Sequence, residues 1–416
     1  MHILKPLPAL RQVFQPLVVG LLLLVSACAA PERKVVAPPP PPPVAVVPDL
    51  PPEIRQNRVA LLVPLTGANA PVGQSIANAA SMALLDLGDS SINLRVYDTT
   101  PGPAAAASRA LAEGAGVILG PLLAGDVRAV AAVSGGVPLL SFSNDSSLAG
   151  GNIFILGYQP DQAISRVVAY ARSRGVERFA ALVPAGIYGQ RVQTAFVRAV
   201  AAGGGKTTAL ATYTREPSRM GAAVREVTAF DTRNRASAVG TTVRSDGSVA
   251  SSTATKLPPP PFQALLIADS GSNAAQFLPA LSRFGVPPGS VTLLGTELWN
   301  NEPGLATAAA LRGAMFATVS DGNFRTLASR YKTRHGSTPS RLASLGYDAV
   351  LLVNSVAGNW KLGEAFPTAA LRSRQGFSGI DGAFRFDASN IALRALEVEQ
   401  IGEGRFKTVS SAPAGF

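Results

Sequence analysis

The stretch from Arg58 to Leu87 constrains the fold more than any other part of the sequence. It begins with the apolar run Val59 to Val63, which is too continuous for a strand with one face in water. We therefore expect a parallel strand that is buried on both faces. Pro64 ends this run, a loop of small residues follows, and apolar residues then recur at helical spacing from Val72 to Leu87. Strand, loop and helix in this order form the first unit of a doubly wound sheet, in which ligands bind at the carboxyl ends of strands.

The same alternation continues along the chain and predicts an α/β fold with two doubly wound parallel-sheet lobes. At 416 residues, the chain is long enough for two lobes. The pattern breaks at a polar insertion, residues 240–261, and ends in short segments typical of antiparallel strands. Around the insertion it predicts helices over Met220 to Asp231 and Ala274 to Phe284, and strands over Phe262 to Ala268 and Ala314 to Thr318. We assign residues 58–157 and 296–362 to a first lobe, and residues 158–295 and 363–416 to a second lobe.

Residues 1–27 have the pattern of a secretion signal. Lys5 and Arg11 precede the apolar stretch Leu17 to Val25, which falls short of the about 20 residues that span a bilayer. The stretch ends in Val-Ser-Ala-Cys, and Cys28 is the only cysteine in the sequence. This ending resembles the bacterial lipobox, in which the cysteine is lipidated; the alternative is an ordinary signal peptide with an incidental cysteine. Because Ala29 rather than aspartate follows, the resemblance implies lipid anchoring at the periplasmic face of the outer membrane.

Residues 28–57 read as a lipidated cysteine followed by a proline-rich tether. Six consecutive prolines, Pro38 to Pro43, favour a polyproline II spacer, and about 25 such residues reach about 75–80 Å. Loss of the signal peptide removes Lys5 and Arg11 and lowers the formal charge from +11 to +9. An exported basic protein fits an anionic cell-wall polymer or an acidic protein surface better than nucleic acid, although a merely solvated basic surface also fits.

The sequence lacks the residues that most catalytic sites need. Only two histidines occur, and His2 leaves with the signal, so His335 stands alone. With Cys28 lipidated, a zinc site and a Cys/His nucleophile are excluded, and no Gly-x-Ser-x-Gly elbow accompanies His335. The glycine-rich segments 114–116 and 203–207 lack the spacing and the strand-to-helix context of phosphate loops. We expect no catalytic residue, metal or cofactor, and a binding or regulatory protein rather than an enzyme.

Seven segments resemble the type I periplasmic substrate-binding fold over roughly residues 57–410. They read VALLVPLTG, VILGPLLAGDVRAVA, VPLLSFSND, IYG, ALLIADSG, SLGYDAVLL and FSGIDGAFRFDASNIALRALEVEQIGEG, and they occur in the order that the fold requires. The resemblance implies two lobes joined by three crossings, with a ligand cleft between them. The best-known members carry leucine, isoleucine and valine to a membrane transporter.

A narrower resemblance is to the penicillin-binding protein activator lipoproteins. It rests on the lipobox, the long spacer, the GPLL run at 120–123 and the segment FDTRNRASAV at 230–239. This chain departs from them because a proline-rich linker replaces their helical-repeat amino-terminal domain. The resemblance implies a non-catalytic outer-membrane lipoprotein that regulates a peptidoglycan synthase. The alternative is a solute-binding lipoprotein that serves the permease of an ABC transporter for branched-chain amino acids or a related small molecule.

Resemblance to the amino-acid binders also implies a set of cleft residues. Hydroxyls after the fourth strand would hold a ligand carboxylate, and a tyrosine of the second lobe and an acidic residue after a later strand would hold its ammonium group. With the loop after the first strand, the matching positions are Thr66, Gly67, Ser141, Ser143, Asp145, Tyr188 and Glu297. Asp145 stands where the transporter family usually has threonine, and it would repel a ligand carboxylate. The cleft would then bind another ligand or none; alternatively, Ser143 and Asp145 cap a helix, Tyr188 belongs to the core and Glu297 pairs with an arginine.

Overall fold

The computed structural model describes residues 56–88, 91–237, 241–243, 245–247, 249–251 and 257–413. The predicted signal peptide, the lipidation of Cys28 and nearly all of the tether lie outside these residues. In the part of the chain that the structure describes, no helix combines the length and the apolar character needed to cross a bilayer.

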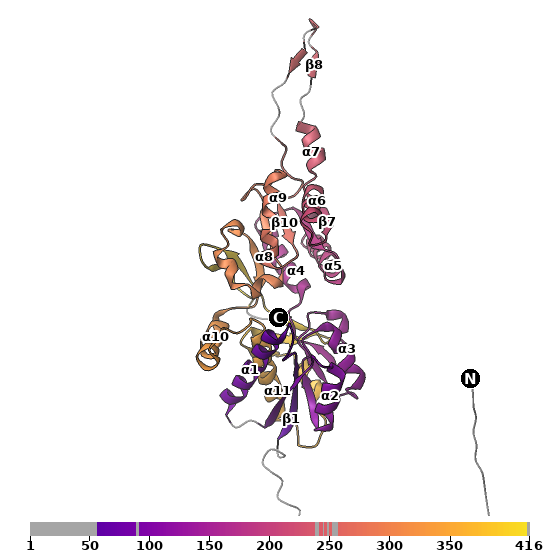
Figure 1. Cartoon of the computed structure of the whole chain (residues 1–416), viewed down its shortest axis with the longest axis vertical. Coiled ribbons are helices and arrows are strands. Elements are labelled where there is room, and N and C mark those ends of the chain that lie inside the picture. The colour runs from indigo at the N-terminus through magenta and orange to yellow at the C-terminus, as the bar shows by residue number, and fades with distance from the viewer. Residues whose placement is uncertain are drawn as a thin grey trace, which may run out of the picture. The chain divides into compact units, whose positions relative to one another are not determined.

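The first lobe is built on a five-stranded parallel sheet with strand order β2-β1-β3-β4-β5 (Figure 1). Its elements up to the first crossing are β1 (Asn57–Val63), α1 (Ala70–Leu87), β2 (Ile92–Asp98), α2 (Pro103–Ala112), β3 (Ala115–Leu119), α3 (Ala124–Val133), β4 (Leu139–Ser141), the 3-10 turn η2 (Ser146–Leu148) and β5 (Ile153–Ile155).

The central strand β1 is buried on both faces, as its apolar run predicts. Val59, Leu61 and Val63 pack in one cluster with α1 and α11 (Ala343–Ala357). Ala60 and Leu62 point the other way and pack against α2 and α3. Helices therefore cover both faces of this sheet, which explains why the strand carries no polar residue between 59 and 63.

The second lobe is built on a seven-stranded sheet with order β17-β16-β12-β11-β10-β6-β7. Its strands are β6 (Arg178–Pro184), β7 (Lys206–Tyr213), β10 (Ala264–Ile267), β11 (Thr292–Leu294), β12 (Met315–Thr318), β16 (Glu397–Ile401) and β17 (Phe406–Ser410). Its helices are α4 (Pro160–Ser173), α5 (Ile187–Ala202), α6 (Pro217–Val227), α7 (Phe230–Ser237), α8 (Gly271–Ala275) and α9 (Leu278–Arg283). Helices α4 and α5 cover one face of the sheet, and α6, α8 and α9 cover the other.

The structure corrects the predicted boundaries of the lobes in the last third of the chain. We placed residues 296–362 in the first lobe, but β12 pairs with β11 and β16 in the second sheet. The 3-10 turns that precede β12 belong to the second lobe as well: η3 (Glu297–Asn301), η4 (Pro303–Thr307) and η5 (Ala309–Leu311). Conversely, η6 (Thr368–Arg372), β13 (Phe377–Gly379), β14 (Gly382–Phe386) and β15 (Ala392–Arg394) pack on the first lobe with α11, although we placed 363–416 in the second. Helix α10 (Gly322–His335) also belongs to the first lobe. The chain thus crosses between the lobes before α4, after β12 and after β15.

Three local predictions also change. The helix predicted from Met220 to Asp231 is divided into α6 and α7 by Ala229, which has a φ of 49° that a helix does not allow. The helix predicted over 274–284 is similarly divided into α8 and α9. The polar insertion contains an antiparallel pair, β8 (Thr241–Val243) and β9 (Val249–Ser251), which we did not predict.

Candidate binding site between the lobes

The loop after β4 is held by a ladder of its own polar side chains. Ser141 Oγ donates to the carbonyl of Pro121 at 3.0 Å and accepts from the amide of Ser143 at 3.1 Å. Ser143 Oγ in turn accepts from the amide of Asp145 at 3.1 Å, and Asp145 Oδ1 caps the turn η2 by accepting from the amide of Ser147 at 2.9 Å. The hydroxyls of Ser141 and Ser143 are buried and serve this loop, so the helix-capping interpretation of Asp145 is confirmed.

Asp145 also forms an ion pair across the cleft. Arg191, on α5 of the second lobe, places Nη2 2.6 Å from Asp145 Oδ1 and donates to Ser147 Oγ at 3.1 Å. Burial alone would raise the pKa of Asp145, but the hydrogen bonds from Ser147 and Arg191 outweigh it and hold the pKa below its usual value. We call this pair the interlobe clasp. Arg191 is the positive charge that neutralises Asp145. The sequence did not predict this partner, because Arg191 lies 46 positions away from Asp145.

Tyr188 and Glu297, the two residues for which the resemblance implies ammonium binding, are in contact in the second lobe. The Tyr188 hydroxyl lies 3.2 Å from Glu297 Oε1 and 3.1 Å from Thr296 Oγ1. Burial raises the pKa of Glu297 to about 7, although the hydrogen bond from Tyr188 opposes that rise. Among the residues that the structure describes, no arginine forms an ion pair with Glu297, which corrects the alternative interpretation; its hydrogen-bond partners include Tyr188 and Asn144.

Thr66 and Gly67 turn toward the neighbouring strand β2. Thr66 Oγ1 donates to Asp98 Oδ2 at 2.8 Å, and the Thr66 carbonyl accepts from Thr100 Oγ1 at 3.0 Å. Gly67 has a φ of +71°, so it makes the tight turn that a side chain would strain. Both residues are exposed and shape the loop after β1.

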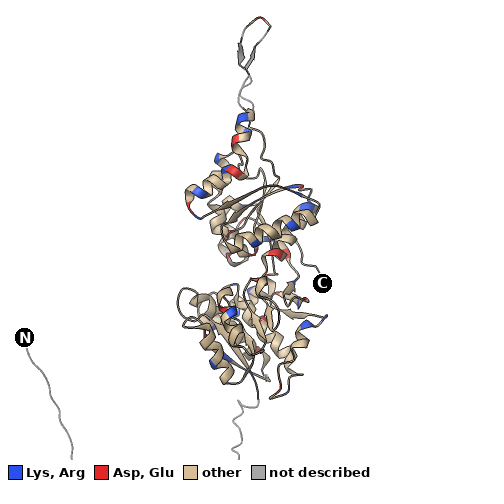
Figure 2. Ribbon diagram, turned by 90° about the vertical axis from the view of Figure 1, so that its right-hand side faces the viewer, with Lys and Arg blue, Asp and Glu red and all other residues tan. Residues whose placement is uncertain are grey.

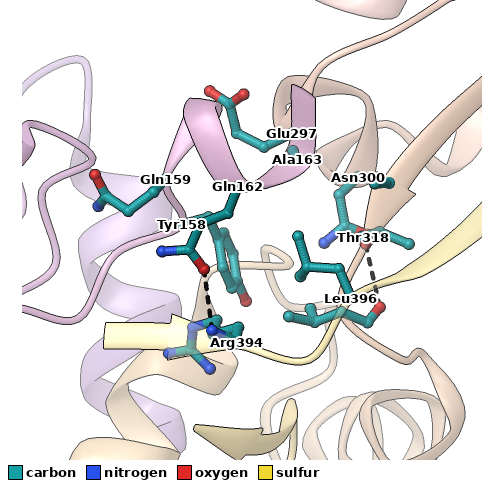
Figure 3. A pocket seen from close by; sticks show the side chains of 11 residues that line it. Tyr158, Gln159, Gln162, Ala163, Glu297, Asn300, Thr318, Arg394 and Leu396 are labelled. Atoms are coloured by element: carbon teal, nitrogen blue, oxygen red, sulfur yellow. Dashed lines mark hydrogen bonds between the residues drawn. The ribbon is translucent and has the colours of Figure 1, made fainter. Parts of the chain in front are cut away.

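Two hollows lie near the clasp. The larger one, about 350 Å³, is open and is lined by Asn144 and Ser146 of the first lobe and by Ile187, Arg191 and Arg198 of α5, among others. The smaller one has a volume of about 20 Å³ and lies where the chain crosses between the lobes, beside Tyr158, Glu297 and Arg394. Figure 3 shows Tyr158 between Glu297 above and Arg394 below. A cavity of this size holds about one water molecule, whereas ligand pockets usually exceed about 300 Å³.

The crossings themselves contain a buried charge cluster that we did not predict. Asp381 accepts hydrogen bonds from Arg341 Nη1 at 2.7 Å, from the Tyr158 hydroxyl at 2.6 Å and from Ser344 Oγ at 2.9 Å. Arg394 adds a second guanidinium, 3.9 Å from Asp381 Oδ2. These residues come from segments up to 236 positions apart, from Tyr158 to Arg394, and no local sequence pattern links them.

Removing the clasp should let the lobes separate. We expect Arg191→Ala to lower the free energy of unfolding by about 1 kcal/mol, because the arginine is partly exposed to water. Small-angle X-ray scattering should then give a larger radius of gyration. Arg198→Ala is the matched control, because Arg198 lies on the same helix and 3.7 Å from Asp161 in an exposed pair. An unchanged radius in Arg191→Ala would mean that the clasp does not hold the lobes.

Known proteins share this architecture. The crystal structure of the leucine-binding protein LivK from Thermotoga maritima has a TM-score of 0.62 at 16% identity, covering 86% of this chain and 99% of its own. A periplasmic ligand-binding protein of a branched-chain amino acid ABC transporter from Burkholderia xenovorans gives 0.67 at 15% identity, with 86% and 95% covered. A solute-binding protein from Rhodopseudomonas palustris, solved with 3,4-dihydroxybenzoic acid, gives 0.61 at 16% identity, with 86% and 97% covered. At these identities the likeness establishes the fold.

Sequence comparisons give the family. The uncharacterized protein RP748 of Rickettsia prowazekii is 28% identical over 144 residues, which are 34% of this chain and only 38% of that relative. The profile of the family described as periplasmic binding protein matches residues 56–404, which is most of the chain. Together with the two lobes, one on a parallel sheet and one on a mostly parallel sheet, and the three crossings, this match shows that the chain belongs to the periplasmic binding protein family.

Proposed function

We propose that this chain is a non-catalytic lipoprotein of the outer membrane that binds a peptidoglycan synthase and regulates it, as penicillin-binding protein activators do. The observation that carries the proposal is the interlobe clasp. Asp145 puts the protein's own carboxylate on Arg191, in the loop where an amino-acid receptor would hold the carboxylate of its ligand. A cleft in which the protein's own carboxylate neutralises this arginine suits a protein-binding module better than a solute carrier.

The sequence supplies the rest of the support. The lipobox at Cys28 and the following Ala29 favour the outer membrane, and the tether is long enough to hold the domain well away from it. The formal charge of +9 after processing suits an acidic partner surface.

A reconstituted assay tests the proposal directly. The lipidated protein, purified in detergent, should raise the rate of glycan polymerisation by a purified class A penicillin-binding protein from the same cells. Cys28→Ser should leave an unprocessed precursor that takes up no palmitate in cells. A polymerisation rate that does not respond to the protein would contradict the regulatory role, and continued palmitate labelling of Cys28→Ser would contradict the anchor.

The second candidate function is that of a solute-binding lipoprotein of an ABC transporter. The hydrogen bond between Tyr188 and Glu297 favours it, because these two groups could receive a ligand ammonium. The structural neighbours named above are transporter proteins, which supports the same alternative.

Thermal unfolding with branched-chain amino acids separates the two functions. A ligand at about 100 times its Kd stabilises the native state by about 2.7 kcal/mol, which should raise Tm by about 1 °C or more. We expect no shift with millimolar leucine, isoleucine or valine, because Arg191 is already paired with Asp145 and is not available to the carboxylate of an amino acid. Asp145→Thr, which frees Arg191, should be the variant that responds. A shift of the unmodified protein that disappears in Glu297→Ala would favour the transporter function.

A further inference from the structure

The insertion between β7 and β10 leaves the second lobe at the edge that faces away from the cleft. The residues that form the clasp follow the carboxyl ends of β4 and β6, so the carboxyl ends of both sheets face the cleft. The amino ends of the strands therefore lie at the outer edges. Asn57, where the tether joins β1, lies at the outer edge of the first lobe, and the return of the insertion to β10 lies at the outer edge of the second. In Figure 1, α7 and the β8–β9 pair extend from that edge.

One buried arginine fixes the base of this insertion. Arg233, on α7, donates from Nε to the carbonyl of Pro258 at 2.7 Å, and from Nη1 to the carbonyls of Thr228 and Phe284 at 3.2 and 3.0 Å. Its Nη2 donates to the carbonyl of Gly285 at 3.0 Å. A guanidinium with five donors in a fixed plane thus ties α7, the returning segment and the end of α9 together. The surface beside this joint is consequently a built feature of the fold.

A groove of about 790 Å³ runs between α6 and α9 beside this joint. Its aromatic end is the pair Phe230 and Phe284, whose ring centroids are 5.1 Å apart. Its walls include Ala222 and Ala280, together with Gly221 in the middle of α6. A Cβ built on Gly221 would have no atom of the described chain within 4 Å. Glycine at such a position costs a helix about 1 kcal/mol relative to alanine, and the internal packing does not require it.

The charges at the groove are positive on balance. Arg225 is bound to Asp231, at 2.7 and 2.9 Å, whereas the Arg283 guanidinium lies 5.7 Å from the ring centroid of Phe284. The ion pairs among the described residues include none between Arg283 and a carboxylate. In Figure 2, basic positions also mark α7 and the helices at its base. Arg283 is therefore a cation available to a carboxylate from outside.

We propose that the groove between α6 and α9 is the docking site for a partner protein, and that the docking element is an amphipathic helix with small apolar residues and adjacent carboxylates. Two helices with small side chains leave room for a third helix at close distance, and Arg283 selects an acidic one. This inference rests on the proposed function for the identity of the partner, a peptidoglycan synthase. The groove lies at the end of the domain opposite the attachment of the tether, which is the end that an anchored protein presents to a distant partner.

Site-specific photo-crosslinking of the full-length protein in cells tests this site. Benzoylphenylalanine in place of Gly221 starts from a wall of the groove, at a position where a Cβ has no atom of the described chain within 4 Å. We expect irradiation to give an adduct that fluorescent penicillin labels, which identifies the partner as a penicillin-binding protein. The matched control carries benzoylphenylalanine in place of Gly125, on α3 of the first lobe, where a Cβ also meets open space. This control should give no labelled adduct.

Charge reversal provides the second arm. Arg283→Glu, combined with the crosslinker at position 221, should reduce the labelled adduct by about tenfold, which corresponds to about 1.4 kcal/mol. Arg174→Glu, an exposed arginine of the same lobe outside the groove, should leave the yield unchanged. Melting temperatures of both variants confirm that they fold.

The outcomes separate this inference from the proposed function. A labelled adduct from position 125 but not from 221 overturns the groove and leaves the synthase as partner. An unlabelled adduct of twice the mass of the chain at 221 identifies a second copy as the occupant and overturns the inference. If neither position gives a labelled adduct, the groove is again wrong, and the polymerisation assay then decides whether the proposed function fails with it.

Discussion

Replacing Asp381 by alanine is expected to lower the free energy of unfolding by about 3–5 kcal/mol. Asp381 is 1% exposed and accepts three hydrogen bonds, from Arg341, Tyr158 and Ser344. Its removal takes away the carboxylate that Arg341 and Arg394 share. Arg341 keeps an ion pair with Asp321 at 2.9 Å, whereas the buried guanidinium of Arg394 loses its carboxylate in this cluster. A buried charge without its counter-charge is among the costliest changes in a protein.

Chemical denaturation of the full chain measures this effect, and a second aspartate provides the control. Asp231→Ala removes the partner of Arg225, and both members of that pair are more than half exposed, 55% and 51%. The control should therefore cost less than about 1 kcal/mol. Equal costs for the two variants would mean that the cluster at the crossings contributes no more than a surface ion pair.

The same cluster shows what a sequence can and cannot predict. The apolar runs at Val59–Val63 and 264–267 predicted buried strands, because a strand that is covered on both faces has no room for polar residues. The charged residues of the cluster carry no such periodic signal. Each looks like an ordinary surface residue in the sequence, and only the fold places Asp381 against Arg341 and Arg394.

The wrong lobe boundaries have a related cause. β12 was correctly predicted as a strand, but its four residues do not encode which sheet receives them. That choice depends on its pairing with β16, which lies about 80 residues later and is antiparallel to it. The three-residue strand β5 was missed because so short a run has no periodicity to detect.

The candidate site divides in the same way. The resemblance predicted that Tyr188 and Glu297 hold a ligand ammonium group, which stays a prediction, and the structure places the two side chains in hydrogen-bond contact. The role of Asp145 was only partly predicted. Its cap on η2 follows from the short spacing to Ser147, whereas its ion pair with Arg191 requires the two lobes to meet.

The buried carboxyl of Glu297 should make stability fall as pH rises. Its pKa is about 7 in the folded protein, because burial disfavours the charged form, and about 4.3 in the unfolded chain. Between these values the native state holds a proton that the unfolded state has lost. The stabilisation is therefore complete below about pH 4.3 and disappears as pH rises through about 7. The shift corresponds to about 4 kcal/mol across that range.

Glu297→Gln removes this dependence while keeping an acceptor for Tyr188. Burial also raises the pKa of Asp348 and of Glu399 to about 7, so the wild-type protein loses stability in this range for several reasons. The informative quantity is consequently the difference between variant and wild type, measured by denaturation at pH 5 and at pH 8. We expect Glu297→Gln to gain up to about 3 kcal/mol relative to wild type between these two pH values.

This experiment also bears on what the cleft does. A receptor for amino acids needs Glu297 as a carboxylate, because only the ionised form attracts an ammonium group. If the variant and wild type lose stability in parallel, Glu297 is ionised throughout the range and is ready for such a ligand, which favours the transporter function. If the variant gains as expected, Glu297 is a neutral acid at pH 6, and ammonium binding would first have to remove its proton. With Arg191 paired to Asp145 and Glu297 neutral, the cleft then attracts neither the carboxylate nor the ammonium group of an amino acid. This is what we expect of a fold that is used to bind a protein.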